Sequence, residues 1–222
     1  MTGVQTCALP IYRIDLEAIA ALHPDLVVAW ASALPPHSLA ALQGLGIPVF
    51  RSEPRHLDEI PSTLERLGRL TGTEASAGDA ASRFRANLAA LHARYGGRPV
   101  VSVFFQVWHA PLMTINGVQI MSDVIRLCGG RNVFAADQLM VPTIDPEAVV
   151  AVDPEVIVAA LDGGTAAAGE AFARWRALPR MRAVARAHLF ALDANLITRQ
   201  TSRILLGAAT LCTALEQVRT GR

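Results

Sequence analysis

One pattern occurs twice in the sequence, and this repeat constrains the fold more than any other feature. The segments Asp15–Ala29 and Asp145–Ala159 read DLEAIAALHPDLVVA and DPEAVVAVDPEVIVA. In each copy an Asp that can cap a helix precedes a Glu in the first turn, where the helix dipole favours an anion. The helix ends before a proline, and the β-branched runs Leu26–Ala29 and Val156–Ala159 are typical of buried parallel strands. The repeat predicts two similar α/β lobes.

The longest uninterrupted helical pattern lies between the two copies, at Thr73–Tyr95. Thr73 is a suitable N-cap, and Gly96 and Gly97 end the pattern. A helix of this length spans roughly 33 Å, so we predict a rigid strut. The other segments alternate, as a mostly parallel sheet in each lobe requires. Predicted helices are Pro36–Leu45, His56–Leu70, Gln119–Cys128, Gly169–Leu178 and Arg203–Val218, the last burying Leu205, Leu206, Ala209, Cys212 and Leu215; predicted strands are Pro48–Phe50, Val100–Gln106 and Leu189–Leu192.

Composition and charge exclude several classes of function. A net charge of +1 gives no electrostatic footprint for nucleic acid, and no nucleic-acid-binding motif is present. All basic residues are Arg, which excludes a lysine nucleophile or Schiff base. Apolar stretches such as Ile204–Leu215 are shorter than the roughly 20 residues of a membrane helix. There is also no nucleophile elbow, phosphate-binding glycine loop or closely spaced set of His and Cys ligands, so we do not expect an enzyme.

The first residues, 1–11, are set apart from the rest of the chain. They lack the charged and apolar regions of a signal peptide and resemble the translation of a sequencing-library adaptor, so we interpret them as a non-native leader. We expect an N-terminal lobe at 12–72, a connecting helix at 73–97 and a C-terminal lobe at 98–222. The N-terminal lobe has far fewer residues before its copy of the repeat than the C-terminal lobe has. We therefore expect it to be truncated, with any native signal or lipid anchor missing.

Setting the leader aside removes Cys7 and leaves Cys128 and Cys212. Cys also packs as a small hydrophobe, so the residues alone leave both a disulfide and two buried free thiols open.

The order of these features resembles the class III periplasmic substrate-binding proteins of ABC importers, and more narrowly their cobalamin-binding members. The resemblance rests on two α/β lobes, one long helix, a Cys-Gly-Gly that ends a helix and an Arg-x-x-x-Arg that opens the last one. It covers about residues 12–220. The matching stretches are Leu16–Trp30, Gly46–Val49, Val103–Gln106, Asp123–Phe134, Val141–Val150 and Arg199–Leu215. It implies two Rossmann-like lobes joined by a single long helix, the helical-backbone metal receptor type.

The resemblance implies a periplasmic carrier that captures cobalamin or a related corrinoid in a cleft between its lobes. Such a carrier delivers its ligand to the permease of an ABC importer, holds no cofactor or resident metal, and meets the membrane only through that docked transporter. An iron-siderophore or haem receptor of the same fold is the alternative within this class. Haem receptors commonly use a Tyr ligand, and only Tyr12 and Tyr95 are available. A bilobal metal chelatase using His109 and an acid is the alternative from another class.

The same resemblance implies a set of ligand contacts. Trp30 matches a cleft tryptophan, with core packing as its structural alternative, and Arg199 matches an arginine near the corrin side chains. Asn195 stands where the relatives carry Asp. Met113 and Val141 stand where the relatives carry aromatic side chains. The wall that the second lobe contributes to the cleft is therefore less aromatic than in those relatives. Trp108, His109 and Phe50 are possible substitutes, although His109 could equally be an exposed loop residue.

Two further roles follow from the resemblance alone. Glu147 matches an acid that docks onto the permease, whereas the counterpart in the first lobe falls on Pro36; Glu53 and Glu17 are candidate substitutes. Cys128 and Cys212 match a pair that is disulfide-bonded in the relatives, so the resemblance favours a disulfide, as suits an oxidising periplasm.

Overall fold

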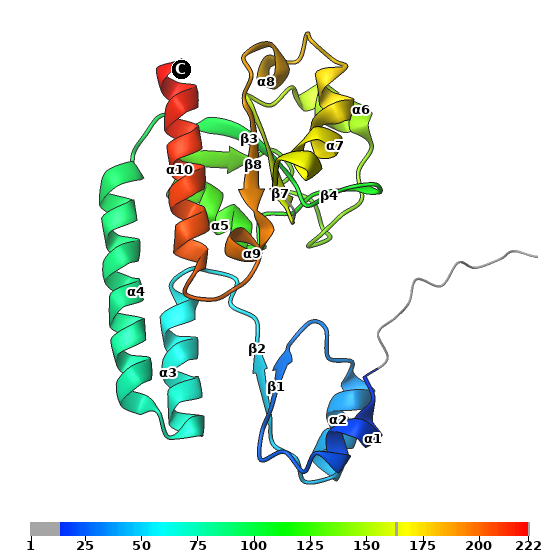
Figure 1. The fold of residues 1–222 in the computed structure, drawn as a ribbon, viewed down its shortest axis with the longest axis vertical. Coiled ribbons are helices and arrows are strands. Elements are labelled where there is room, and N and C mark those ends of the chain that lie inside the picture. The colour runs from blue at the N-terminus through cyan, green and yellow to red at the C-terminus, as the bar shows by residue number, and fades with distance from the viewer. Residues whose placement is uncertain (1–13, 163, 222) are drawn as a thin grey trace, which may run out of the picture. The chain divides into compact units, whose positions relative to one another are not determined.

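The computed structural model describes residues 14–162 and 164–221. The predicted leader at 1–11, with its Cys7, and Tyr12 lie outside the described residues. The chain divides into two compact units, Met1–Glu53 and Pro54–Arg222, each of which is an assembly of helices and strands (Figure 1). The lobe limits at 12–72, 73–97 and 98–222 stay a prediction. Throughout the described ranges, every helix is too short or too polar to traverse a lipid bilayer.

The first unit contains the first copy of the repeat. Its elements are α1 (Leu16–Ala21), β1 (Val27–Trp30), α2 (Pro36–Gly44) and β2 (Val49–Ser52). The strands pair in parallel, and the Asp15 side chain caps α1 by accepting from the Ala18 amide at 2.9 Å, as predicted. The prediction of a buried strand is wrong here. Among the described residues β1 pairs only with β2, and Val28 is 58% exposed.

The second unit is built on a four-stranded parallel sheet in the order β6–β3–β7–β8. Its strands are β3 (Val101–Gln106), β6 (Gly130–Asn132), β7 (Val156–Leu161) and β8 (Leu189–Asp193). The central strands β3 and β7 are almost entirely buried, which confirms the strand of the second repeat copy. The sequence does not predict β6, because this strand is short and starts within the Cys-Gly-Gly that ends a helix.

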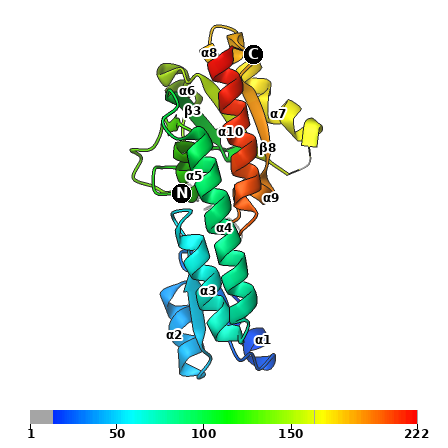
Figure 2. The same cartoon turned by 90° about the vertical axis from the view of Figure 1, so that its left-hand side faces the viewer.

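Helices cover both faces of this sheet, so the second unit has three layers (Figures 1 and 2). Val103 and Phe105 pack with α5 and α10 on one face, whereas Phe104 packs with α6, α7 and α8 on the other. This division follows from the alternation of side chains along a strand. The helices are α3 (Glu59–Thr71), α4 (Glu74–Tyr95), α5 (Ile120–Leu127), α6 (Pro146–Val152), α7 (Gly164–Arg176), α8 (Arg182–Ala185), α9 (Ala194–Ile197) and α10 (Ile204–Thr220).

The long helix predicted between the repeat copies is α4, and α3 runs beside it in both views (Figures 1 and 2). Gly68 allows this close approach, because a Cβ atom there would lie 2.4 Å from Cβ of Ala77. Thr73 does not cap α4 through its side chain, contrary to prediction; its hydroxyl instead hydrogen-bonds that of Thr71 at 2.8 Å.

Three other helix predictions need correction. Asp145 precedes α6, but its side chain caps no amide, and Pro146 begins the helix without an N–H to satisfy. Helix α7 begins at Gly164, earlier than predicted. Leu206 is 58% exposed, because the buried face of α10 runs through Ile204, Leu205, Ala208, Leu211, Cys212 and Leu215.

A disulfide joins α5 to α10 in the core of the second unit. The Sγ atoms of Cys128 and Cys212 are 2.02 Å apart, and both residues are fully buried, which confirms the pairing that the resemblance implied. Gly129 ends α5 with φ +70°, a conformation that favours glycine. The Arg219 guanidinium of α10 donates to the carbonyls of Cys128 and Gly129 at 2.7 and 3.0 Å, so the two helices are tied twice.

Candidate functional site

A concave pocket of about 460 Å³ opens at the carboxyl edge of the sheet in the second unit. Parallel α/β sheets bind ligands at this edge, because the loops that follow the strands meet there. Its walls come from the ends of β3 and β7, from α7, from α9 and from the short strand β4 (Trp108–His109). The lining residues are Gln106, Val107, Trp108, His109, Ala160, Leu161, Asp162, Ala167, Glu170, Ala194 and Thr198.

A small hairpin presents two of the predicted residues to this pocket. β4 pairs with β5 (Leu112–Met113), which places Trp108 opposite Met113 and His109 opposite the buried Leu112. The Trp108 indole donates to the Ala110 carbonyl at 2.8 Å and stacks on the His109 imidazole, with ring centroids 5.7 Å apart. Trp108 is nevertheless 55% exposed, so its ring is held in place while it remains available to a ligand.

The segment that carries Val141 lies against the same hairpin. Backbone hydrogen bonds of 3.1 Å run from Thr114 to Pro142 and from Asn116 to Met140, and Met113 pairs with Thr143. The segments that carry Met113 and Val141 are thus joined by backbone hydrogen bonds, although neither residue lines the pocket.

Three hydrogen-bonded polar side chains lie at the ends of β7 and β8; Asp162 lines the pocket, whereas Asn195 and Arg199 do not. Asn195 donates through Nδ2 to Asp162 at 2.9 Å and accepts through Oδ1 from Nε of Arg199 at 3.0 Å. An amide can do both, whereas an ionised carboxylate at this position could not donate. The terminal nitrogens of Arg199 bond no described residue, so the guanidinium is oriented yet able to donate to a ligand.

The sequence does not reveal two acidic members of this site. Glu170 of α7 lies with Oε1 3.2 Å from Nε2 of His109, which is partly buried on β4 and not in an open loop. Asp162 follows β7 and meets Asn195. Positions 61 and 33 residues apart share no spacing pattern, so only the fold brings these pairs together. The position of Asp162 just after a buried strand was the one available signal.

Gln106 forms the rigid floor between β3 and α7. It is buried, its Nε2 donates to the Ala171 carbonyl at 3.1 Å, and its Oε1 accepts from Trp175 Nε1 at 2.7 Å. Both functions of the amide are therefore used by the fold, and the residue positions α7 and its Glu170 relative to the strand ends.

The other two candidates lie in the first unit. Trp30 ends β1 and is 41% exposed, so core packing does not describe it. Val28 pairs in register with Phe50, and side chains two residues apart share a face of a strand. Val28, Trp30 and Phe50 therefore form an apolar strip, of which the sequence did not indicate Val28.

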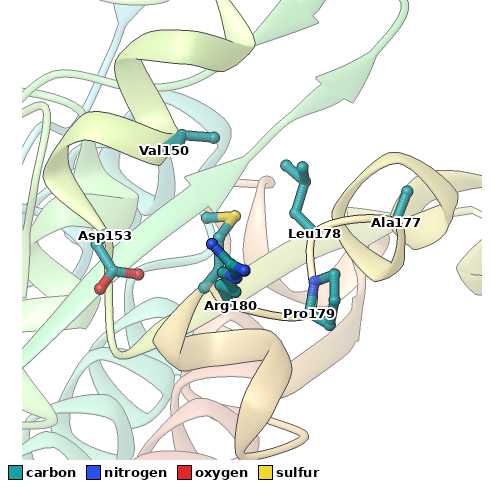
Figure 3. Close-up of a pocket in the computed structure, with 7 residues that line it drawn as sticks. Val150, Asp153, Ala177, Leu178, Pro179 and Arg180 are labelled. Carbon is teal, nitrogen blue, oxygen red and sulfur yellow. The ribbon is translucent and has the colours of Figure 1, made fainter.

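A separate hollow of about 410 Å³ lies between α6 and the segment that joins α7 to α8 (Figure 3). Val150, Leu178 and Pro179 are among its lining side chains. Val150 and Leu178 also line an adjoining hollow that includes the exposed Glu147 and Arg174. Glu147 thus borders a mostly apolar groove, whereas Pro36, its predicted counterpart, begins α2.

The described side chains do not form a site for a bare metal ion, which needs several ligands close together. Within residues 14–162 and 164–221, no three His, Cys, Asp or Glu side chains gather as candidate metal ligands.

Comparison with known proteins agrees with this architecture. The model of the family described as "Periplasmic binding protein" matches residues 9–196. The vitamin B12-binding protein of Yersinia pestis (strain Pestoides F) is 35% identical over 207 residues, which cover 93% of this chain and 71% of that protein. The chain belongs to the periplasmic binding protein family. This membership confirms the resemblance and the α/β fold class, and the family is one of binding proteins.

Solved structures place this periplasmic binding protein among relatives of known fold. The periplasmic vitamin B12 binding protein BtuF of Vibrio cholerae has a TM-score of 0.84 and 31% identity, over 92% of this chain and 78% of that one. The periplasmic heme-binding protein RhuT from Roseiflexus sp. RS-1 has a TM-score of 0.77 and 24% identity, over 91% and 80% of the two chains. At that identity the second likeness shows the fold alone.

Proposed function

We propose that this periplasmic binding protein captures cobalamin or a related corrinoid and delivers it to an ABC importer. The pocket at the carboxyl edge of the sheet carries the proposal, because it joins exposed aromatic surface to oriented polar groups. A corrinoid has the matching chemistry: a broad macrocycle for rings to pack on, and peripheral amides and a phosphate for donors to bind. The two vitamin B12-binding relatives support this ligand over other chelates.

The predicted contacts other than His109 each have a role in this proposal. Trp108 contacts the macrocycle, supported by the hairpin that also holds Met113 and by the segment of Val141. Arg199, aligned by Asn195, donates to amide or phosphate oxygens through its planar fork. In the first unit, the strip that contains Trp30 and Phe50 offers further apolar surface of the kind a macrocycle packs on.

We assign the partner surface to Glu147 and the groove beside it. An exposed carboxylate next to apolar side chains suits a permease that presents arginines and an apolar contact. We place this exchange in the periplasm, where the Cys128–Cys212 disulfide would persist. The protein then needs no cofactor, and it meets the membrane only through its transporter.

A visible-absorption titration tests the ligand. The purified protein is titrated with cyanocobalamin, haemin and a ferric siderophore, and we expect saturable binding of cyanocobalamin alone. The substitutions Trp108→Ala and Arg199→Ala should each weaken that binding about tenfold, since one lost contact of this kind is worth about 1.4 kcal/mol. Arg83→Ala, an exposed arginine of α4, is the matched control and should bind as the unaltered protein does.

The same titration decides between the alternatives. Tight binding of haemin or siderophore without cyanocobalamin would replace the corrinoid with that chelate. Insertion of a metal into an empty tetrapyrrole would show a chelatase and overturn the proposal of a carrier.

A further inference from the structure

His109 is the one pocket residue that combines a metal-binding side chain with an orienting carboxylate. Its Nε2 atom lies 3.2 Å from Oε1 of Glu170, so this nitrogen carries the proton of a neutral ring. The Nδ1 atom, which then holds a lone pair, bonds no described residue. Imidazoles that ligate metals usually donate their second ring N–H to a carboxylate, a backbone carbonyl or a water.

The backbone and the neighbouring ring restrict how this imidazole can move. β4 is paired with β5, and the Val107 amide donates to the Met113 carbonyl at 2.9 Å just before the hairpin. Trp108 stacks against the ring with an interplanar angle of 27°. The side chain is 35% exposed in a pocket wall, so a ligand can reach a ring that is already oriented.

The surroundings indicate which kind of metal this single imidazole suits. A bare ion takes several protein ligands, and the described residues hold no cluster of three around His109. A chelate brings its own equatorial ligands and needs only one more donor, along its axis. Neutral imidazole is a common axial donor for such metals.

We propose that His109 is an axial ligand to the metal of the bound chelate and that Glu170 positions it. The inference rests on the proposed function and adds a preference, among the corrinoids bound, for those with an exchangeable axial position. In the step, the lone pair of Nδ1 forms a bond to cobalt(III) as the bond from cobalt to its axial water breaks. The water leaves, the proton stays on Nε2 facing Glu170, and no atom is oxidised or reduced.

Two cobalamins that differ in their axial group provide the test. Aquacobalamin carries an exchangeable water, whereas cyanocobalamin carries a tightly held cyanide. With the unaltered protein we expect aquacobalamin to show the absorption shift that free imidazole produces in it. We also expect aquacobalamin to bind about tenfold more tightly than cyanocobalamin, a difference of about 1.4 kcal/mol for the added coordination bond.

Phenylalanine substitutions separate coordination from packing. His109→Phe retains an aromatic ring but lacks the nitrogen, so it should lose the absorption shift and the preference for aquacobalamin while still binding cyanocobalamin. His92→Phe, the same substitution on an exposed residue of α4, should retain both.

The role of Glu170 as a positioning residue is tested by the same preference for aquacobalamin over cyanocobalamin. Glu170→Ala should reduce the ratio of aquacobalamin affinity to cyanocobalamin affinity about tenfold, because the carboxylate acts on this ratio through the imidazole. Glu170→Gln, whose carbonyl can still accept from Nε2, should restore part of it.

Each remaining outcome counts against a specific step. If cyanocobalamin binds but aquacobalamin keeps its own spectrum, the axial ligand is disproved and the proposed function stands. A shift that persists in His109→Phe would assign the coordination elsewhere and overturn the role of His109. If neither cobalamin binds, the proposed function fails, and the inference fails with it.

Discussion

Glu155 joins the first residues of β7 to those of β3. Its Oε2 accepts hydrogen bonds from the amide and the hydroxyl of Ser102, both at 2.8 Å, and its own amide donates to the Ser102 hydroxyl at 3.0 Å. Burial acts to raise the pKa of the Glu155 carboxyl, but the hydrogen bonds from Ser102 and the charges of Arg182 and Arg186 outweigh it. The pKa therefore lies below its ordinary value.

This lowered pKa predicts a pH-dependent contribution to stability. A carboxyl with a lower pKa in the folded state stabilises it above the unfolded value of about 4.3, and that gain is lost as pH falls through the folded pKa. Glu155→Gln should lower the free energy of unfolding by about 1–2 kcal/mol at neutral pH. Urea denaturation at neutral pH and near pH 3 measures this difference, which should shrink in acid. A difference of equal size at both pH values would contradict it; Asp79→Asn on exposed α4 is the control.

Single residues of the candidate site were predictable to different degrees. Trp108 and His109 stand just after a buried strand, and this local signal places them at the carboxyl edge of the sheet. Asp162 also follows a buried strand directly, but its pairing with Asn195 and the pairing of Glu170 with His109 depend on the fold, because the partners are far apart in the sequence. The prediction that Leu206 is buried is wrong, because an apolar residue type does not by itself show which face of a helix packs on the core.

Among the elements, length and burial decided what the sequence could predict. Strands β3 and β7 are uninterrupted apolar runs, and α4 is long enough for its periodicity to stand out. Strands β4 and β5 have two residues each, and their pairing depends on contacts that no periodic pattern records. The two repeat strands have similar sequences but different burial, because burial depends on how many strands and helices surround a strand.

The tie between α5 and α10 gives a prediction at this scale. The Cys128–Cys212 disulfide closes a loop with a sequence separation of 84. In the chain-entropy model, closing a loop of that size destabilises the unfolded chain by about 4.5 kcal/mol. Replacing both cysteines with Ala should lower the free energy of unfolding by about that amount.

Denaturation with and without a thiol reductant checks the effect of the disulfide. Reductant in denaturant should destabilise the unaltered protein and leave the double variant unchanged. Because Arg219 still donates to the carbonyls of Cys128 and Gly129, we expect the variant to keep its helical circular dichroism at low temperature. Equal free energies of unfolding for the two proteins in oxidising buffer would show that the disulfide does not stabilise the fold.

At the scale of the whole molecule, a net charge of +1 leaves little long-range attraction to steer the protein toward a transporter. In the proposed docking to a permease, recognition then depends on local complementarity, and Glu147 lies beside an apolar groove that offers charge and apolar surface together. Charge at the rim of an interface acts mainly on the association rate and on its salt dependence, whereas apolar side chains act on dissociation.

This division of roles predicts different results for two substitutions at the docking surface. Glu147→Arg should weaken binding to the cognate importer in nanodiscs about tenfold, mostly by slower association, and should reduce the salt dependence. Val150→Asp places a charge in the groove and should speed dissociation instead.

Both variants should bind cyanocobalamin normally, since neither residue lines the ligand pocket. Asp79→Arg on α4 reverses an exposed charge elsewhere and should leave both activities intact. If Glu147→Arg bound the importer as tightly as the unaltered protein, docking would have to be assigned to another surface.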